Sequence, residues 1–233
     1  MDKESKWRIK HIEGIIYNKE FTWDLHPDIN FIVGPNGCGK TTVLKNLDEV
    51  IFDNMYHDYE EDLPTFWNPI TKIVFEGSSL SPGVMYLNPS EITLKDLVDK
   101  MFTIHNVHNR CTPIDVLVKE KMLYMNESEI RKLHESLTNF IGEQRMDSFS
   151  DVKHDTSYLS IGEKHLVYIL TSVILTGDNH TILLMDYPDC YLDISWQHHL
   201  LDEILHLNPN IQIICATNSP YLIGGLYDKT LEL

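Results

Sequence analysis

One stretch of the chain has the residue types and the spacing of a loop that holds phosphate groups. Residues 34–41 read Gly-Pro-Asn-Gly-Cys-Gly-Lys-Thr and match the pattern G-x-x-x-x-G-K-[ST] at every fixed position. The glycines let successive backbone N–H groups turn toward an anion, and the positive end of the following helix adds to the attraction. We expect ATP to contact Gly34, Pro35, Asn36, Gly37, Cys38, Gly39, Lys40, Thr41 and Thr42.

Three side chains carry the expected chemistry of this site. Lys40 would reach the β- and γ-phosphates, and the hydroxyl of Thr41 would bind Mg²⁺. Asp186 directly follows the strand-like run 181–185, and such a position places a carboxylate at the ligand-binding edge of a parallel sheet. The signal from Asp186 is weak by itself, because many buried strands end in aspartate. Together the three residues predict a Mg-ATP site in which Lys40 and Asp186 take the catalytic roles and Thr41 and Asp186 bind the metal.

A second short motif, Leu-Ser-Ile-Gly-Glu at residues 159–163, has two compatible interpretations. Ser160 and Glu163 have the spacing of a capping box, in which each side chain bonds the backbone N–H of the other at a helix start. A capped helix start with Gly162 exposed would also form an anion site suited to a γ-phosphate. The residues by themselves favour the cap.

The segments around these motifs predict the elements that position them. The apolar run 29–33 is typical of a buried strand, and apolar residues recur at helical spacing over 41–52. Strand, glycine loop and helix therefore follow one another as a phosphate loop requires. After Ser160 a helix to residue 175, a strand over 181–185, a helix through residue 207 and a strand over 211–216 alternate, which predicts a parallel sheet covered by helices.

The remaining segments predict smaller parts of the fold. Runs of β-branched and aromatic residues indicate a small antiparallel sheet near the N-terminus, and residues 53–70 resemble an exposed connection. We expect one α/β domain, with a core over 1–90 and 151–233 and a helical lobe over about 91–150. The expected strands lie at 7–17, 20–25, 72–75, 84–87 and 229–233, and the expected lobe helices at 91–102, 114–124 and 127–141.

Composition limits the classes of function. A chain of 233 residues suits one nucleotide-binding unit, and its net charge of −16 disfavours direct binding to nucleic acid. No apolar run reaches the length of a membrane span and the N-terminus lacks the apolar core of a secretion signal, so we expect a cytoplasmic protein. The four cysteines are scattered and are expected to be reduced thiols: Cys38, Cys111, Cys190 and Cys215.

The order of the motifs resembles that of ABC ATPases. The phosphate loop is followed by a helical segment, the signature-like residues 159–163, the strand ending in Asp186, a segment at 188–193 similar to a D-loop, and a strand leading to Thr-Asn-Ser-Pro at 217–220. Within the superfamily the chain looks like the RecF/SMC/OLD-type branch. The resemblance implies a head-to-tail dimer that traps ATP between one chain's phosphate loop and the partner's Ser160, Gly162 and Glu163.

The chain departs from the family at three positions that serve hydrolysis. The glutamate that normally follows the strand aspartate is Tyr187, and the switch histidine is Asn218. The glutamine between core and lobe is also missing, with Asn88 or Ser90 in its place. Asp189 is an alternative water-orienting carboxylate. Since a lost general base costs about 10²- to 10⁴-fold in rate, we expect Mg-ATP binding with slow or absent hydrolysis.

Three functions fit this pattern. The leading hypothesis is an ATP-gated dimer that acts as a switch or scaffold for a soluble effector such as a nuclease. The resemblance implies that such a dimer would work in DNA repair or anti-phage defence. The alternatives are the nucleotide-binding subunit of a membrane transporter and an active DNA-processing ATPase. For the adenine, Tyr17, Phe21 and Trp23 are equally candidates for stacking and for core packing.

Overall fold

The computed structural model describes residues 8–56, 69–77, 83–88, 114–146 and 157–233, and the chain divides into two compact units. The first unit comprises Met1–Tyr86, Asn179–Pro188 and Asn210–Leu233. The second comprises Leu87–Asp178 and Asp189–Pro209. The predicted helix over 91–102 lies outside the described residues.

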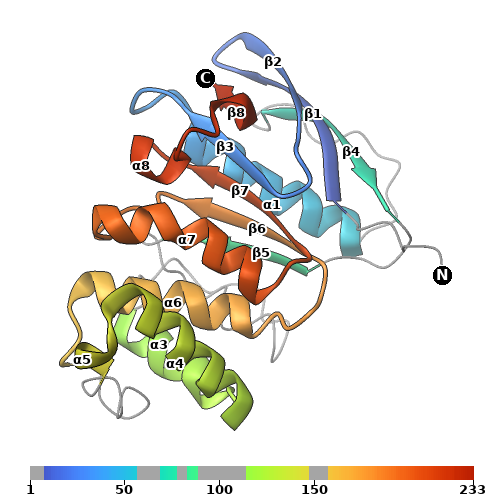
Figure 1. The fold of residues 1–233 in the computed structure, drawn as a ribbon. Coiled ribbons are helices and arrows are strands. Elements are labelled where there is room, and N and C mark those ends of the chain that lie inside the picture. The colour runs from blue at the N-terminus through green and yellow to red at the C-terminus, as the bar shows by residue number, and fades with distance from the viewer. Residues whose placement is uncertain (1–7, 57–68, 78–82, 89–113, 147–156) are drawn as a thin grey trace. The chain divides into compact units, whose positions relative to one another are not determined.

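The main sheet of the first unit is five-stranded and has the order β5-β6-β7-β3-β8. β6 pairs in parallel with β7, and β3 pairs in parallel with both β7 and β8 (Figure 1). The predicted parallel sheet is confirmed, and the C-terminal strand lies at its edge as expected. The strands are β3 (Ile29–Val33), β5 (Gly83–Leu87), β6 (Thr181–Asp186), β7 (Ile211–Ala216) and β8 (Thr230–Glu232).

A second, three-stranded sheet confirms the antiparallel sheet that the N-terminal sequence predicts. Its order is β2-β1-β4, and β1 pairs antiparallel with both neighbours. The turn between the first two strands contains only Tyr17 and Asn18, both at positive φ, as two-residue hairpin turns of type I′ require. The strands are β1 (Arg8–Ile16), β2 (Lys19–Asp24) and β4 (Ile70–Glu76).

Helix α1 (Lys40–Tyr56) closes the core of the first unit. It begins at the lysine of the phosphate loop and runs four residues beyond the predicted end at residue 52. Its apolar face packs against strands of both sheets, and burial of this face stabilises the helix. The helix contributes Val43, Leu44, Leu47 and Ile51, all fully buried.

A buried glutamine connects the two sheets of the first unit. Gln212 on β7 accepts a hydrogen bond from the Ile9 N–H at 2.8 Å. Its amide nitrogen donates to the carbonyls of Ile9 at 2.8 Å and His26 at 2.9 Å. This side chain satisfies both backbone groups of a β1 residue that is itself fully buried.

Replacing Gln212 by leucine is therefore expected to lower the free energy of unfolding by about 2–4 kcal/mol, because the buried polar groups of Ile9 lose their partners. Urea titration followed by circular dichroism measures the change. Gln144→Leu, at an exposed position, is the matched control. Equal stabilities of the two variants would contradict this account of the sheet connection.

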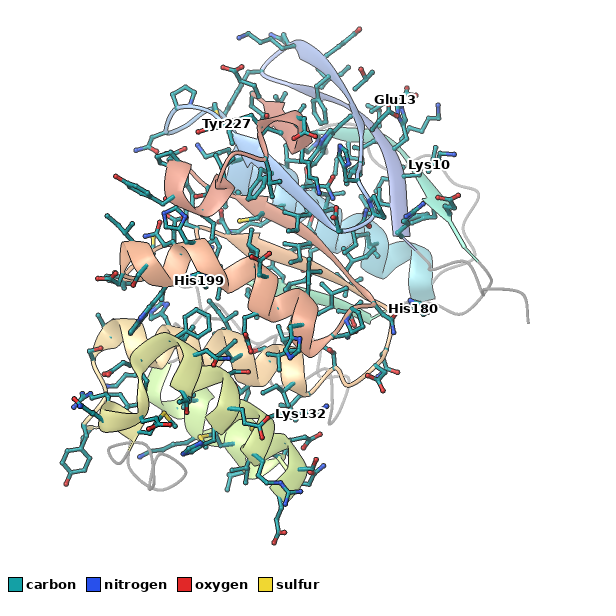
Figure 2. The ribbon with its side chains drawn as sticks, in the orientation of Figure 1. Lys10, Glu13, Lys132, His180, His199 and Tyr227 are labelled. Carbon is teal, nitrogen blue, oxygen red and sulfur yellow. The ribbon has the colours of Figure 1, made fainter. Side chains whose placement is uncertain are left out.

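The second unit is helical. Helix α6 packs with α3, α4 and α7, and its residues from Leu166 to Ile174 are all buried. The exposed residues Lys132 and His199 lie on α4 and α7, respectively (Figure 2). None of the helices within the described ranges is long and apolar enough to cross a membrane. The helices are α3 (Ile114–Leu123), α4 (Glu127–Ile141), α5 (Glu143–Met146), α6 (Ile161–Ile174) and α7 (Ile194–Leu207).

Two short elements complete the first unit after β7. Helix α8 (Pro220–Ile223) is capped by Ser219, whose hydroxyl accepts from the Leu222 N–H. A 3-10 turn, η2 (Tyr227–Lys229), follows and leads into β8. Lys229 donates to both carboxylate oxygens of Asp28 at 2.9 Å, which joins this turn to the start of β3.

Candidate nucleotide-binding site

The loop between β3 and α1 has the backbone that its glycines predict. Gly34, Gly37 and Gly39 all lie at positive φ, between 83° and 146°. A Cβ atom on Gly39 would lie 2.0 Å from the Ile16 side chain, and one on Gly34 would lie 2.8 Å from the Leu233 carbonyl oxygen. Backbone conformation therefore disfavours a side chain at both ends of the loop, and at Gly34 the nearby backbone carbonyl also leaves no room for one.

Lys40, the first residue of α1, is held inside the loop. Its side chain is buried, with only 3% of the residue exposed. The Nζ atom donates to the carbonyl oxygens of Gly34 at 2.6 Å and Pro35 at 3.0 Å. The ammonium group thus lies at the centre of the loop, where it can exchange a carbonyl partner for a phosphate oxygen.

Thr41 and Asp186 meet at the predicted magnesium position. The Thr41 hydroxyl donates to Asp186 Oδ1 at 3.1 Å, and the Tyr86 hydroxyl donates to Asp186 Oδ2 at 3.4 Å. Asp186 ends β6 and is 2% exposed. A hydroxyl beside a carboxylate offers the hard oxygen ligands that Mg²⁺ prefers, so these residues fit the ion.

The two altered positions also belong to this unit. Asn218, which follows β7, donates from its side-chain nitrogen to Asn36 Oδ1 in the loop at 2.8 Å. Tyr187 lies at φ 52°, an uncommon conformation for a bulky residue, and its ring centroid is 5.5 Å from Lys40 Nζ. An amide and an aromatic ring therefore lie beside the phosphate loop, at the two positions where the motif resemblance implies an imidazole and a carboxylate. Asp189 belongs to the second unit, so its role as a substitute base stays a prediction.

The three aromatic residues considered for adenine stacking differ in their surroundings. Trp23 is 6% exposed and belongs to the core of the first unit, and Phe21 packs against the same core. Tyr17 is 71% exposed. Its ring atom Cε2 lies 3.6 Å from the point where Gly39 would carry a Cβ. Of the three, only Tyr17 combines exposure with closeness to the loop.

At the start of α6 the predicted capping box is present. Ser160 Oγ accepts from the Glu163 N–H at 3.3 Å, and Glu163 Oε2 accepts from the Ser160 N–H at 2.6 Å. The expectation of an exposed Gly162 is wrong. This residue is buried, and a Cβ on it would lie 2.4 Å from the carbonyl oxygen of Tyr191. Close backbone packing is thus the reason for glycine at this position.

Sequence reasoning missed one residue at this helix start. Arg145 on α5 donates from Nε to Glu163 Oε1 at 3.0 Å and from a terminal nitrogen to Glu163 Oε2 at 3.3 Å. It lies 18 positions before Glu163 and outside every recognisable motif, so no local pattern signals it. Asn88, one of the two candidates for the missing glutamine, is buried, and Ser90 lies outside the described residues.

One turn further along α6, His165 is buried without a hydrogen-bond partner for Nδ1. Its ring centroid lies 5.1 Å from that of Tyr191. Burial lowers the pKa of His165, because the charged imidazolium loses its hydration. Below the ordinary histidine pKa, His165 binds a proton in the unfolded chain more readily than in the folded chain. The free energy of unfolding therefore falls as the pH falls.

We accordingly expect His165→Phe to weaken the dependence of stability on pH. The unfolding free energy of the wild type should fall more than that of the variant between about pH 7 and about pH 5.5, the window set by the ordinary histidine pKa. Urea titrations at the two pH values give the comparison, with the exposed His199→Phe as control. Parallel pH profiles for wild type and His165→Phe would contradict the assignment.

Comparisons with known proteins bear on the identity of this site. No family model matches the chain. A candidate ABC transporter ATP-binding protein of Methanosarcina acetivorans is 26% identical over 186 residues, which cover 78% of this chain and 25% of the relative. The phosphate import ATP-binding protein PstB of Desulfitobacterium hafniense is 23% identical over 227 residues, covering 88% of this chain and 78% of the relative. The chain spans between 25% and 60% of the length of three candidate ABC transporter ATP-binding proteins that it matches.

Solved structures agree with this fold. A candidate ABC transporter ATP-binding protein from Pyrococcus furiosus superposes with a TM-score of 0.55 at 20% identity, covering 96% of this chain and 97% of the other. An inward-facing structure of a candidate metal-chelate type ABC transporter gives a TM-score of 0.50 at 14% identity, covering 97% of this chain and 79% of the other.

The comparisons point to ABC transporter ATPases rather than to the RecF/SMC/OLD-type branch that the motif order suggests. The fold, with its glycine loop between β3 and α1, agrees with the same superfamily. We conclude that the chain carries an ABC-type ATP-binding domain with the P-loop NTPase fold.

Proposed function

We propose that the chain is the nucleotide-binding subunit of an ABC transporter-type assembly and that Mg-ATP holds two copies head to tail. The observation that carries this proposal is the arrangement around the phosphate loop, where buried Lys40 lies among the loop carbonyls and Thr41 contacts Asp186 at 3.1 Å. Lys40 and the loop amides bind the phosphates. Thr41 and Asp186 bind Mg²⁺, which neutralises charge that develops on the phosphates.

The second half of the composite site comes from the partner copy. Ser160, Gly162 and Glu163 form a capped helix start, and the positive end of such a helix favours an anion. A γ-phosphate held in one chain's loop would therefore attract the helix start of the other chain. Mg-ATP acts in this proposal as the link between the two copies.

Hydrolysis within the dimer is slow. Tyr187 and Asn218 cannot accept a proton from water as glutamate and histidine do, and the missing glutamine removes a third polar group. The residues that would bind Mg-ATP are present, whereas the usual residues that orient water are replaced. We therefore expect nucleotide binding without fast turnover. Asp189 remains the candidate substitute base.

The assembly's other component is a membrane-embedded subunit, as the names of the relatives suggest. A second candidate is a soluble effector such as a nuclease, which the dimer would switch or hold in place. The substitutions at Tyr187 and Asn218 favour this second candidate, because a switch needs binding more than turnover. A net charge of −16 disfavours nucleic acid as a direct partner of the isolated chain.

Sedimentation of the purified chain with and without Mg-ATP tests the proposal. We expect a monomer without nucleotide and a dimer with Mg-ATP, and Ser160→Arg should bind nucleotide but remain monomeric. A wild type that binds Mg-ATP without dimerising would overturn the ATP-linked dimer. Affinity purification from native membranes and from the soluble fraction then separates the two partner classes.

Tyr17 is expected to contribute to nucleotide affinity by stacking on the adenine. Its exposure of 71% and its position beside Gly39 leave the ring free to do so. Tyr17→Ala should weaken Mg-ATP binding by about 1 kcal/mol, or roughly fivefold, and Tyr17→Phe should bind like the wild type. Calorimetric titration with ATP and with inorganic triphosphate provides the check, since triphosphate affinity should not change. An equal loss for both ligands would show that the ring acts on the loop instead.

A further inference from the structure

The start of α6 is held by more contacts than its capping box. Ser160 and Glu163 bond each other's backbone N–H groups, and the Tyr191 carbonyl packs against Gly162. Arg145 adds a third interaction, through two hydrogen bonds to the Glu163 carboxylate. Three separate segments of the second unit therefore meet at one turn of helix.

Arg145 contacts the chain on both sides of Ser160. Besides the two bonds to Glu163, a terminal nitrogen donates to the Tyr158 carbonyl at 3.3 Å. Tyr158 precedes the helix and Glu163 lies in its first turn, so one guanidinium connects the approach to the helix with the helix itself. A planar guanidinium suits this task because its donors have a fixed geometry.

The position of Arg145 is itself fixed by the helices around it. Helix α4 ends at Ile141, and the N–H of its C-cap residue Gly142 donates to the Thr138 carbonyl at 3.0 Å. Helix α5 follows directly and carries Arg145. Trp196 of α7 donates to the Phe140 carbonyl at 2.8 Å and so anchors the end of α4. Figure 1 shows α5 after α4 and near the N-terminal end of α6.

The charge of Arg145 matters because the carboxylate that it contacts is buried. The Glu163 side chain is 7% exposed, whereas that of Arg145 is 47% exposed. Burial by itself raises the pKa of the Glu163 carboxyl, but hydrogen bonds from Arg145 and from the Ser160 N–H outweigh this effect, and the pKa lies below its ordinary value. Glu163 is therefore a buried anion at neutral pH, and Arg145 is the cation that compensates it.

An anion at this point has a consequence for nucleotide binding. A carboxylate stabilises the positive end of a helix, but it also repels a phosphate that approaches the same helix end. Paired with Arg145, Glu163 keeps the cap while its charge is neutralised. Without Arg145, the uncompensated charge would both loosen the turn and oppose the partner's γ-phosphate.

We propose that Arg145 is a positioning residue of the composite ATP site: through Glu163 and the Tyr158 carbonyl it holds the first turn of α6 in the form that receives the partner's nucleotide. The proposal rests on the ATP-linked dimer described above. Arg145 does not touch the nucleotide in this scheme. It acts on the site by fixing Ser160 and by cancelling the charge of Glu163.

A four-variant comparison tests this role: wild type, Arg145→Ala, Glu163→Gln and the double variant. We expect Arg145→Ala to bind Mg-ATP within about twofold of the wild type, because the phosphate loop belongs to the other unit, but to dimerise about tenfold more weakly. Glutamine can keep the capping bond without a charge. The double variant should therefore dimerise within about threefold of Glu163→Gln, so that removing the arginine has little effect once the carboxylate is gone.

Hydrogen exchange and a surface control separate positioning from general damage. The amides of residues 160–163 should exchange faster in Arg145→Ala than in the wild type without nucleotide, while those of α1 should not change. Arg131→Ala removes an exposed arginine from α4 and should behave like the wild type in every assay. Arg145→Lys, which keeps the charge without the planar donors, should lie between wild type and Arg145→Ala.

The possible failures are distinct. If the wild type binds Mg-ATP and stays monomeric, the proposed dimer is wrong and the role of Arg145 with it. If the wild type dimerises and Arg145→Ala dimerises equally well, the role of Arg145 alone is wrong. The role is also wrong if Arg145→Ala weakens dimerisation equally in the wild-type and Glu163→Gln backgrounds, because Arg145 would then not act through Glu163.

Discussion

Replacing Lys40 by alanine is expected to abolish measurable Mg-ATP binding, with a loss of at least about 100-fold in affinity. The residue supplies charged hydrogen bonds to phosphate oxygens in a buried loop, and each such bond contributes about 1.5–3 kcal/mol. Its ammonium already lies among the loop carbonyls of Gly34 and Pro35, at 2.6 and 3.0 Å. Calorimetric titration with Mg-ATP measures the loss directly.

The same substitution should leave the fold intact. Lys40 is buried, and its ammonium contacts two loop carbonyls, the Cys38 sulfur and the Tyr187 ring but no described carboxylate, so alanine removes a buried charge without breaking an ion pair. The nucleotide-free variant should unfold at the same temperature as the wild type or at a higher one. Lys45→Ala, one turn along the same helix, is the control and should bind Mg-ATP normally. A Lys40→Ala protein that binds Mg-ATP like the wild type would refute the assignment of the loop.

Much of the fold follows from patterns short enough to detect in the sequence. The apolar runs at β3, β6 and β7 each lie within one strand, and the glycine loop between β3 and α1 is a local motif. Local patterns work here because parallel strands are buried on both faces and become continuously apolar. The end of α1 is less predictable, since no glycine or proline directly follows Tyr56 in the sequence to mark it.

Contacts between distant segments could not be predicted in the same way. Gln212 lies 203 positions from Ile9, and nothing around either residue indicates that one side chain satisfies the other's backbone. Arg145 is similarly remote from Glu163, and arginine near a helix end is too common to single out. The close packing at Gly162 involves the Tyr191 carbonyl, which belongs to a segment beyond α6 and β6 in the sequence. In each case the decisive partner is a backbone group or a charge that only the fold supplies.

The sequence predicts which residues of the site are substituted, but it does not predict what the substituted residues contact. The sequence identifies Tyr187 and Asn218 by alignment with motifs, and it gives their missing functions. It does not indicate that Asn218 bonds Asn36 in the loop or that the Tyr187 ring lies 5.5 Å from Lys40 Nζ. These contacts place one of the two residues against the phosphate loop and the other against its lysine.

Replacing Tyr187 by glutamate is expected to raise single-turnover hydrolysis of ATP by about 10²- to 10⁴-fold, the contribution of a general base. The position follows Asp186 directly, so a carboxylate there would lie beside the proposed metal ligand, where the resemblance implies a water-orienting group. Rapid quenching of a reaction between excess enzyme and labelled ATP measures the step without product release. Affinity should fall modestly, because loss of the ring above Lys40 removes about 0.5–2 kcal/mol of cation–π attraction.

Tyr187→Gln separates the base from the loss of the ring. Glutamine has the shape of glutamate and also removes the aromatic contact, but it cannot take a proton from water. Backbone strain should affect both variants equally, since glutamate and glutamine have the same shape and take the same position at φ 52°. Hydrolysis that rises in Tyr187→Glu but not in Tyr187→Gln therefore identifies a restored base. Brisk hydrolysis by the wild type would instead assign that role to another carboxylate, with Asp189 the first to replace, and Asp189→Asn should then abolish it.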